Sequence, residues 1–381
     1  MLSLFVLIKP ASGDCNLRCE YCFVHLGKAQ NVSEKRHRMS TEVLEHLISR
    51  CLEYSERQCI FGWQGGEPLL MGLDFFRQAL RLQDKYRRRG QEVFNCIQTN
   101  AILLTEEWAT FFKENRFLVG VSLDGPKEEH DRYRLDVAGR GSYNRVMQGI
   151  NLLKRCGADF NILAVVNNYT ARHPMRIYNF LRSQGFSYLQ FIPCIERNPR
   201  TGDLAAFSVT PEDYAQFLKV IFTQWIEDLY GGHRISIQLF DNLVQALLGV
   251  GPDLCILRGR CDGKVVVDYD GGAYPCDFYV EDEWRLGNIM EQSLEEMINS
   301  PLAKIFYNRA SAFCRPPRCK DCRWFDLCHG GCPRNRGFGN GDAAQVDFLC
   351  DAYREFFPVA VDTLVDLINQ HRLPNYNAYR V

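Results

Sequence analysis

The first half of the sequence alternates short apolar runs rich in β-formers with longer amphipathic runs. The strand-like runs are Leu4–Ile8, Cys59–Trp63, Val93–Thr99, Leu118–Leu123, Asn161–Val166 and Leu189–Ile192. The helical patterns are Ser40–Tyr54, Leu73–Arg88, Glu106–Glu114, Ser142–Cys156 and Arg172–Ser183. Because strands joined through helices pair in parallel, this alternation predicts an α/β fold. Six units are fewer than the eight of a full barrel, so we expect a partial (β/α)6 barrel.

The second half follows a different pattern. Pro211–Leu229 predicts one more helix, and after Gly231-Gly232 the alternation stops. The remainder is punctuated by cysteines, with one strand-turn-strand pattern at Lys264–Tyr269 and Ala273–Tyr279. A chain of 381 residues exceeds what one core usually supports. We therefore expect two domains, residues 1–235 and 236–381.

Cysteine is the residue type that stands out. Three of the seventeen cysteines lie within Cys15–Cys22, and eight lie between Cys255 and Cys350. The apolar start Leu2–Ile8 lacks a basic stretch before it and a cleavage site after it, so we expect a buried strand rather than an export signal. No run approaches the ~20 apolar residues of a membrane span. We therefore expect a cytoplasmic protein, in which clustered cysteines indicate metal ligands or redox chemistry.

Charge excludes two classes of partner. Lys and Arg total 45 against 46 Asp and Glu, a formal net charge of −1. Nucleic acids and anionic membranes favour basic surfaces, so we expect neither as a partner.

The first cysteine cluster has the spacing Cys15-x3-Cys19-x2-Cys22, directly after the first predicted strand and before Phe23. Four-iron clusters are usually held by four thiolates, so three ligands would leave one iron open. An open iron can chelate the amino and carboxylate groups of S-adenosylmethionine (SAM), as open metal sites bind substrate. A zinc site with a fourth ligand elsewhere is the alternative.

This spacing resembles the signature of the radical SAM superfamily, which has a partial TIM-like barrel. The run Gln64-Gly65-Gly66-Glu67-Pro68 after the second strand is similar to the family's Gly-Gly-Glu-Pro motif, which contacts the SAM amino group. Ser122 and Asp124 end the fourth strand, and Arg134 could pair with the SAM carboxylate. The resemblance implies SAM contacts from Tyr21, Phe23, Gln64, Gly65, Gly66, Glu67, Ser122, Asp124, Arg134 and Ile195.

The C-terminal cysteines form a second pattern, in which Cys319-x2-Cys322-x5-Cys328-x3-Cys332 is the densest part. Eight cysteines are the complement of two four-iron clusters or of two zinc sites, and spacing leaves both open. The layout resembles the SPASM domain, which carries two auxiliary clusters. The resemblance implies three 4Fe-4S clusters in all. The two auxiliary ligand sets would be Cys255, Cys261, Cys276 and Cys332, and Cys319, Cys322, Cys328 and Cys350.

Three further runs narrow the resemblance. Cys276-Asp277-Phe278, Trp324–Cys328 and Cys332–Arg336 are similar to anaerobic sulfatase-maturating enzymes. This family oxidises a cysteine or serine of a sulfatase to Cα-formylglycine. The resemblance implies that an adenosyl radical takes a hydrogen atom from Cβ, that Asp277 takes a proton, and that a cluster accepts the second electron. It also implies two partners, a sulfatase or other peptide or protein substrate and an electron donor such as flavodoxin or ferredoxin.

Two positions depart from the family pattern. Val24 stands where a second aromatic residue is frequent, and Ala101 stands where the family commonly has glycine. Both departures bear on substrate identity more than on fold. A SPASM enzyme that crosslinks or otherwise modifies a ribosomal peptide is therefore the alternative function. A zinc-rich scaffold protein would explain the C-terminal cysteines but not Cys15, Cys19 and Cys22.

Overall fold

The computed structural model describes residues 3–27, 36–261, 264–309, 315–338, 346–370 and 372. They form two compact units, each assembled from separate stretches of the chain. The first unit comprises residues 1–123, 127–163 and 261–307, and the second comprises residues 124–126, 164–260 and 308–381. The domain boundary near residue 235 stays a prediction, because units defined by packing need not follow domains defined along the sequence.

The first unit is built on parallel strands. Consecutive strands β1 to β5 pair in parallel, as the strand–helix alternation predicted. Their bounds are β1 (Ser3–Lys9), β2 (Gln58–Trp63), β3 (Glu92–Thr99), β4 (Leu118–Ser122) and β5 (Phe160–Val166), the last of which ends in the second unit.

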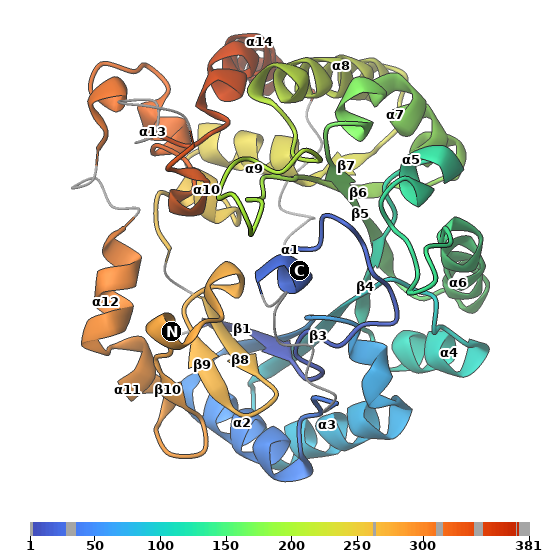
Figure 1. Ribbon diagram of the computed structural model, residues 1–381, viewed down its shortest axis with the longest axis vertical. Helices are drawn as coiled ribbons and strands as arrows, with labels where there is room; N and C mark the ends of the chain where they lie inside the picture. The colour runs from blue at the N-terminus through green and yellow to red at the C-terminus, as the bar shows by residue number, and fades with distance from the viewer. Residues whose placement is uncertain are drawn as a thin grey trace. The chain divides into compact units, whose positions relative to one another are not determined.

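The N-terminal strand β1 lies between two parallel neighbours that are far apart in the sequence. Phe5 is opposite Ile60 of β2 on one side and opposite Lys264 of β8 (Lys264–Asp268) on the other. Figure 1 shows the orange hairpin of β8 and β9 (Gly272–Tyr274) beside blue β1. The predicted strand-turn-strand is therefore confirmed, and β9 pairs in turn with β10 (Gly287–Asn288). The second strand was expected to reach Tyr279 but ends at Tyr274, because Pro275 has no N–H for a ladder.

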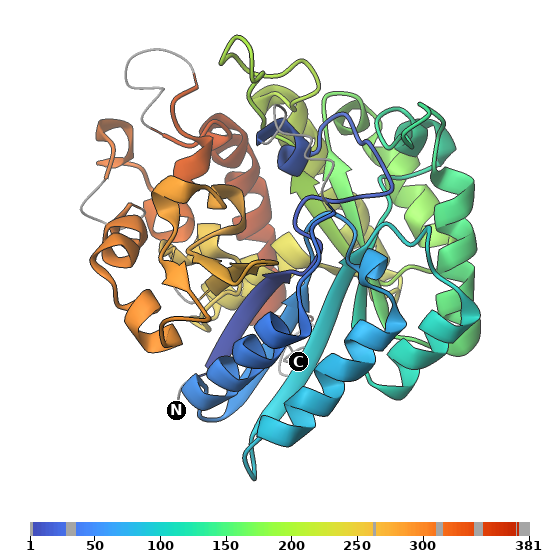
Figure 2. The ribbon, with the colours of Figure 1, turned by 60° about the horizontal axis from the view of Figure 1, so that its bottom comes forward.

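Helices connect these strands. Ser40 caps α2 by accepting a hydrogen bond from the backbone N–H of Val43 at 3.2 Å. Figure 2 shows the blue helices α2 and α3 along one face of the strands of this unit. The helices of the first unit are α1 (Phe23–Gly27), α2 (Thr41–Tyr54), α3 (Leu73–Tyr86), α4 (Glu106–Glu114), α5 (Lys127–Asp131), α6 (Tyr143–Cys156), α11 (Leu294–Ile298) and α12 (Pro301–Asn308).

Aromatic side chains fill the space between strands and helices in the first unit. Phe76 of α3 packs edge-to-face on Trp63 at 5.5 Å and on Trp108 at 5.5 Å between ring centroids. Phe112 and Phe117 extend the same cluster, at 5.4 Å from each other. Burying such large rings is a major source of stability, and it fixes the strand ends that carry the candidate site.

The second unit is mainly helical. The helix predicted at Pro211–Leu229 is α8 (Pro211–Tyr230), and it packs against α14 (Cys350–Asn369), a helix that the sequence did not indicate (Figure 1). The expected end of the alternation at Gly232 was wrong, since one further strand and helix follow it. The remaining elements are β6 (Tyr188–Pro193), β7 (Ser236–Ile237), α7 (Pro174–Ser183), α9 (Gln238–Leu247), α10 (Cys255–Arg258) and α13 (Phe325–Cys328).

These observations confirm the expected α/β class, with a sheet dominated by parallel strands. In the part of the chain described here, none of the helices combines the length and the apolar character that a bilayer crossing needs.

Candidate functional site

The loop that follows β1 brings the first three cysteines together. Cys15, Cys19 and Cys22 lie between β1 and α1, and each is partly buried. Backbone amides lie close to these thiols: Leu17 N–H donates to Cys15 Sγ at 3.4 Å, and the amides of Val24 and His25 lower the pKa of Cys22. Hydrogen bonds of this kind orient and stabilise thiolate ligands.

The three thiols of this loop influence one another electrostatically. Burial raises the pKa of Cys15 to about 12, and the charges of Glu67, Cys19 and Cys22 raise it further. Burial also raises the pKa of Cys22, against the opposing effect of Arg134 and Lys9. Thiols in such surroundings become thiolates when a metal displaces their protons. Three mutually close thiols with backbone amides close to them therefore fit an iron–sulfur cluster that has three protein ligands.

The turn after β2 packs directly against the segment that precedes Cys15. Gly66 N–H donates to Ser12 O at 2.7 Å, and Glu67 N–H donates to Asp14 O at 2.7 Å. A Cβ atom on Gly66 would lie 1.9 Å from Asp14 O. Glycine is required at this position because any side chain would push the two loops apart.

Glu67 is fully buried beneath this turn. Its carboxylate accepts hydrogen bonds from Leu69 N at 3.0 Å, from Thr99 Oγ1 at 2.8 Å and from Asn100 N at 2.8 Å. Burial raises the pKa of Glu67 to about 7, although these hydrogen bonds lower it. The glutamate thus holds the ends of β2 and β3 together next to the cysteine loop.

Arg134 is brought to the cysteine loop by short backbone pairing. Glu20 N–H donates to Tyr133 O at 3.0 Å, and the guanidinium of Arg134 lies 5.5 Å from the ring centroid of Tyr21. Arg134 is only 7% exposed, so its charge is directed into the fold. Ser122 is buried at the end of β4, the end at which ligands gather in parallel α/β folds.

Asp277 lies at the start of the short helix η3 (Asp277–Tyr279), and residues from two other elements hold its carboxylate. Lys9 Nζ donates to Oδ1 at 2.7 Å, and Gln64 Nε2 donates to Oδ2 at 2.6 Å. The next residue, Phe278, packs on Phe23 in a tilted arrangement with 4.8 Å between ring centroids, and Phe23 directly follows Cys22. The structure therefore brings Asp277, Gln64 and the three-cysteine loop together in one unit.

Sequence reasoning missed Lys9. It directly follows the predicted strand Leu4–Ile8 and was given no role, yet its side chain is 5% exposed and paired with Asp277. A signal was present, because a lysine at the carboxyl end of a buried parallel strand stands where ligand-contacting residues gather.

Two of the expected SAM contacts lie in the second unit. Asp124 is buried, and its Oδ1 accepts a hydrogen bond from Val165 N at 2.9 Å. Ile195 is buried as well, and its carbonyl accepts from Arg334 Nη1 at 2.8 Å. Arg334 also pairs with the carboxylate of Glu196, so this arginine holds Ile195 and the residue that follows it. Their contacts with SAM stay predictions.

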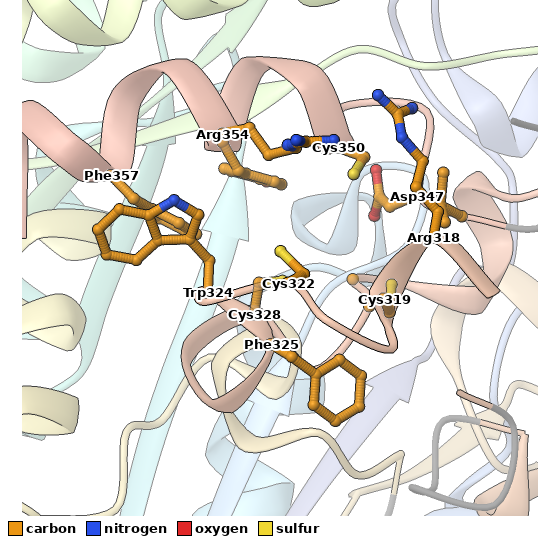
Figure 3. A pocket seen from close by; sticks show the side chains of 14 residues that line it. Arg318, Cys319, Cys322, Trp324, Phe325, Cys328, Asp347, Cys350, Arg354 and Phe357 are labelled. Carbon is orange, nitrogen blue, oxygen red and sulfur yellow. The ribbon is translucent and has the colours of Figure 1, made fainter. Parts of the chain in front are cut away.

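One pocket of the second unit gathers a complete expected ligand set (Figure 3). Cys319, Cys322, Cys328 and Cys350 all line it, together with Trp324, Phe325, Asp347 and Tyr353. Burial raises the pKa of Cys350 to about 12 and that of Cys328 to about 11, and each responds to the charge of Cys319. Four thiols around one cavity fit a fully ligated four-iron cluster.

Asp347 is a further residue that the sequence did not single out. Its buried carboxylate accepts from Cys332 N at 2.8 Å and from Leu349 N at 2.8 Å. It therefore ties the Cys332 segment to the start of α14, which carries Cys350. A lone aspartate in a loop carries no pattern from which this role could be predicted.

The other expected ligand set is divided between the units. Cys255 and Cys332 belong to the second unit, whereas Cys261 and Cys276 belong to the first. Their grouping stays a prediction. Within the described residues, no group of three His, Cys, Asp or Glu side chains is placed so that it could hold a single metal ion. A four-iron cluster needs its thiolates farther apart than a single ion does, because each thiolate binds a separate iron.

Comparison with known families and structures adds an independent observation. Residues 10–181 match the Radical SAM superfamily, and residues 255–323 match an iron–sulfur cluster-binding domain, SPASM. A cysteine-type anaerobic sulfatase-maturating enzyme of Clostridium novyi is 42% identical over 96% of this chain and 97% of its own length. A serine-type enzyme of Bacteroides thetaiotaomicron is 40% identical over 93% of this chain and 88% of its own length.

The solved structures agree with the sequences. Native anSMEcpe with bound AdoMet and Cp18Cys peptide is 39% identical and has a TM-score of 0.88, over 97% of this chain and all of that one. Streptococcus suis SuiB, at 16% identity and a TM-score of 0.62, shares the fold.

Proposed function

Because the chain belongs to the anaerobic sulfatase-maturating enzymes of the radical SAM superfamily, we propose that Asp277 is the base in its oxidation of a sulfatase residue. The residue oxidised is a cysteine or a serine, and the product is Cα-formylglycine. The cofactors are SAM and 4Fe-4S clusters, including the additional clusters of a SPASM domain.

The reaction removes two electrons and two protons from the substrate side chain. From serine this gives the aldehyde directly, and from cysteine it gives a thioaldehyde, which water hydrolyses to the aldehyde with release of hydrogen sulfide. Cys15, Cys19 and Cys22 would hold the cluster that, together with SAM, would supply a 5′-deoxyadenosyl radical for hydrogen-atom abstraction from Cβ, and a cluster would accept the remaining electron. The chain must then remove the thiol or hydroxyl proton, for which a carboxylate within hydrogen-bond reach is suited. Asp277 is the carboxylate that we assign to this step.

The geometry of Asp277 is the observation that carries the proposal. Lys9 and Gln64 each occupy one carboxylate oxygen, at 2.7 and 2.6 Å, so the group is held in one orientation. Each oxygen has two acceptor sites, so both donors leave room for a substrate proton. Phe278 and Phe23 form an aromatic contact that links the base to Cys22.

Further residues support SAM binding in this proposal. Gly65 and Gly66 let the backbone approach closely, and Glu67 fixes the turn that contains them. The cysteine loop and its neighbours contribute Tyr21, Phe23 and Gln64. The other SAM contacts that we propose are Ser122, Asp124, Arg134 and Ile195. We assign the auxiliary ligand sets as expected from the sequence, with the SPASM domain beginning near residue 236.

The electron donor and the location of the protein are also proposals. A reaction of this class needs a one-electron donor, and a flavodoxin or ferredoxin supplies electrons singly. Cluster ligands must be reduced thiols, and cytosolic thiols are kept reduced, so we place the protein in the cytoplasm.

The test uses the anaerobically reconstituted protein with SAM, a reductant and a cysteine peptide such as Cp18Cys. Aldehyde formation is measured by mass spectrometry after hydrazide capture, and 5′-deoxyadenosine is quantified in the same samples. Asp277→Asn should lose aldehyde by roughly 10²-fold or more while 5′-deoxyadenosine is still released.

The matched control is Asp282→Asn, an exposed carboxylate in the 3-10 helix Asp282–Trp284, which should keep both products. Equal loss of both products in Asp277→Asn would assign the residue to folding or SAM cleavage. SAM cleavage without peptide oxidation by the unmodified protein would favour the crosslinking alternative.

A further inference from the structure

Basic residues lie on the segments that form the pocket lined by Cys319, Cys322, Cys328 and Cys350. We call them the basic rim; they come from the segment around Cys319 and from α14, and two of them line the pocket itself (Figure 3). The basic rim consists of Arg315, Arg318, Lys320, Arg323 and Arg354.

The basic rim carries an excess of positive charge. Residues 315–328 contribute four cations against two carboxylates, Asp321 and Asp326, a net charge of +2. At the start of α14, Arg354 is matched by Asp351, and Glu355 pairs with Lys219 at 2.8 Å. The whole chain has a net charge of −1, so this charge is a local feature. An excess of one sign around a pocket attracts partners of the opposite sign.

Most of these charges are not neutralised by neighbours. Arg318 pairs with Asp351, but Arg315, Lys320, Arg323 and Arg354 have no carboxylate partner among the residues that the structure describes. In a second basic run, at residues 85–89, two cations do have carboxylate partners. There Lys85 pairs with Glu45 at 2.7 Å and Arg87 with Asp84 at 3.5 Å.

Two of the arginines are held in place by aromatic rings. The guanidinium of Arg315 lies 4.0 Å from the ring centroid of Phe325, and its Nε donates to Cys319 O at 2.8 Å. The guanidinium of Arg323 lies 4.1 Å from the ring centroid of Trp324. Stacking keeps the charge available and fixes the side chain, so less conformational entropy is lost on binding.

The basic rim is close to the thiols themselves. Arg318 acts electrostatically on Cys350 and Cys319. Cys322 and Cys350 are partly exposed, and Phe325 and Trp324 line the same pocket. Electron transfer weakens steeply with distance, so a carrier seated here would bring its redox group near the four cysteines.

We propose that the basic rim is the docking surface for an acidic electron-carrier protein, one with carboxylates around a flavin or iron–sulfur group. The inference rests on the proposed function, in which electrons pass between the enzyme and a carrier. At each encounter the reduced carrier loses one electron, and the iron–sulfur group held by the four cysteines gains it. No bond forms or breaks, and no proton needs to move.

Contact can be tested directly with reduced flavodoxin, an acidic flavin protein, and the reconstituted enzyme. A zero-length carbodiimide couples carboxylates to ammonium groups, and Lys320 is the only lysine of the basic rim. Peptide mapping should show flavodoxin carboxylates joined to Lys320 at low ionic strength, with loss of the product in high salt. Lys304, exposed on α12, is the internal control. Crosslinks at other lysines with Lys320 unmodified would overturn the proposal.

Electron delivery is tested without any peptide substrate, so that the result does not depend on aldehyde formation. Flavodoxin oxidation by the enzyme is followed in an anaerobic stopped-flow instrument. Lys320→Glu combined with Arg323→Glu should slow the second-order rate about tenfold at low salt, with a smaller effect at high salt. Reduction by saturating dithionite should be unchanged, as should both rates in Arg89→Glu.

Three other outcomes contradict the proposal. Equal loss with flavodoxin and dithionite would mean that the substitutions damage the cluster site. No loss with either reductant would place the carrier elsewhere. An altered KM for an intact sulfatase with unchanged flavodoxin kinetics would make the basic rim a substrate surface. Failure of the proposed function alone would leave flavodoxin kinetics intact while no aldehyde forms.

Discussion

The burial of Glu67 is the clearest electrostatic feature at the scale of single residues. This carboxylate has no exposed surface, and three donors hold it at the end of β3. Burial nevertheless raises its pKa from the ordinary value of 4.5 to about 7. Between these two values, the folded chain binds a proton that the unfolded chain has already lost.

This difference predicts how stability depends on pH. Because the folded state holds more protons, the free energy of unfolding should fall as pH rises from 4.5 to about 7, by roughly 3 kcal/mol in total, and then level off. Glu67→Gln should lack this decline. Denaturant unfolding of both proteins at several pH values measures it, with exposed Glu106→Gln as the control. Parallel pH curves for Glu67→Gln and the unmodified protein would contradict the assignment.

Lys9 gives a second prediction at this scale. Replacing it with methionine removes the ammonium that holds Asp277 Oδ1 and keeps the apolar stem. Aldehyde formation should fall roughly 10²-fold relative to 5′-deoxyadenosine release, because the base loses its orientation. Lys264→Met, an exposed lysine of β8, should keep the ratio of the two products. An unchanged ratio in Lys9→Met would show that Gln64 alone orients the carboxylate.

The residues of the site could be predicted only where they belong to a motif. Cys15, Cys19 and Cys22 follow a fixed spacing, and the Gly65-Gly66 turn does pack against their loop. Lys9 and Asp347 act through contacts with residues distant in the sequence, which no local pattern records.

At the scale of elements, α6 packs unusually closely against the turn after β3. A Cβ atom on Gly149 would lie 2.3 Å from Ala101 O, so the helix backbone almost touches that turn. Ala101 itself has a φ of 63°, in the left-handed region that favours glycine. The position where this chain departs from the family's glycine is thus a strained one.

The close contact of α6 predicts a reversed effect of a common substitution. Glycine to alanine inside a helix usually stabilises by up to about 1 kcal/mol. Gly149→Ala should instead destabilise by about 1–3 kcal/mol, because the added methyl group overlaps a backbone oxygen. Thermal unfolding measures this, and Asn151→Ala, exposed on the same helix, should be close to neutral. A stabilised Gly149→Ala would mean that the turn moves freely.

The elements of the first half could be predicted from the sequence because their signal is local. Apolar periodicity gave each of the strands β1 to β6 to within two residues, together with the helices between them. The pairing of β8 with β1 could not be predicted, since register between distant strands depends on packing rather than on pattern. Helix α14 was missed because it contains Pro358, and a proline inside a helical pattern normally indicates a helix end.

At the scale of the whole molecule, the three cysteine sets predict the metal content. The reconstituted protein should hold about twelve irons with matching sulfide, as three four-iron clusters require. Cys319→Ala combined with Cys322→Ala should lose about four irons, because both line one pocket. Cys156→Ala, on α6, should lose none. Zinc in place of iron in the unmodified protein would contradict the cluster assignment.

The position of β1 between β2 and β8 sets an order of events during synthesis. Lys264 follows its partner Phe5 by about 260 residues, so at about 5–20 residues per second the ribosome needs about 13–50 s to supply β8. Until then one edge of β1 has no partner strand, and Lys9 at its end has no Asp277 to pair with. The nascent chain therefore passes through a state in which half of the site exists and the apolar strand β1 has one unpaired edge. That edge must be shielded, for which a chaperone or the ribosome surface would serve.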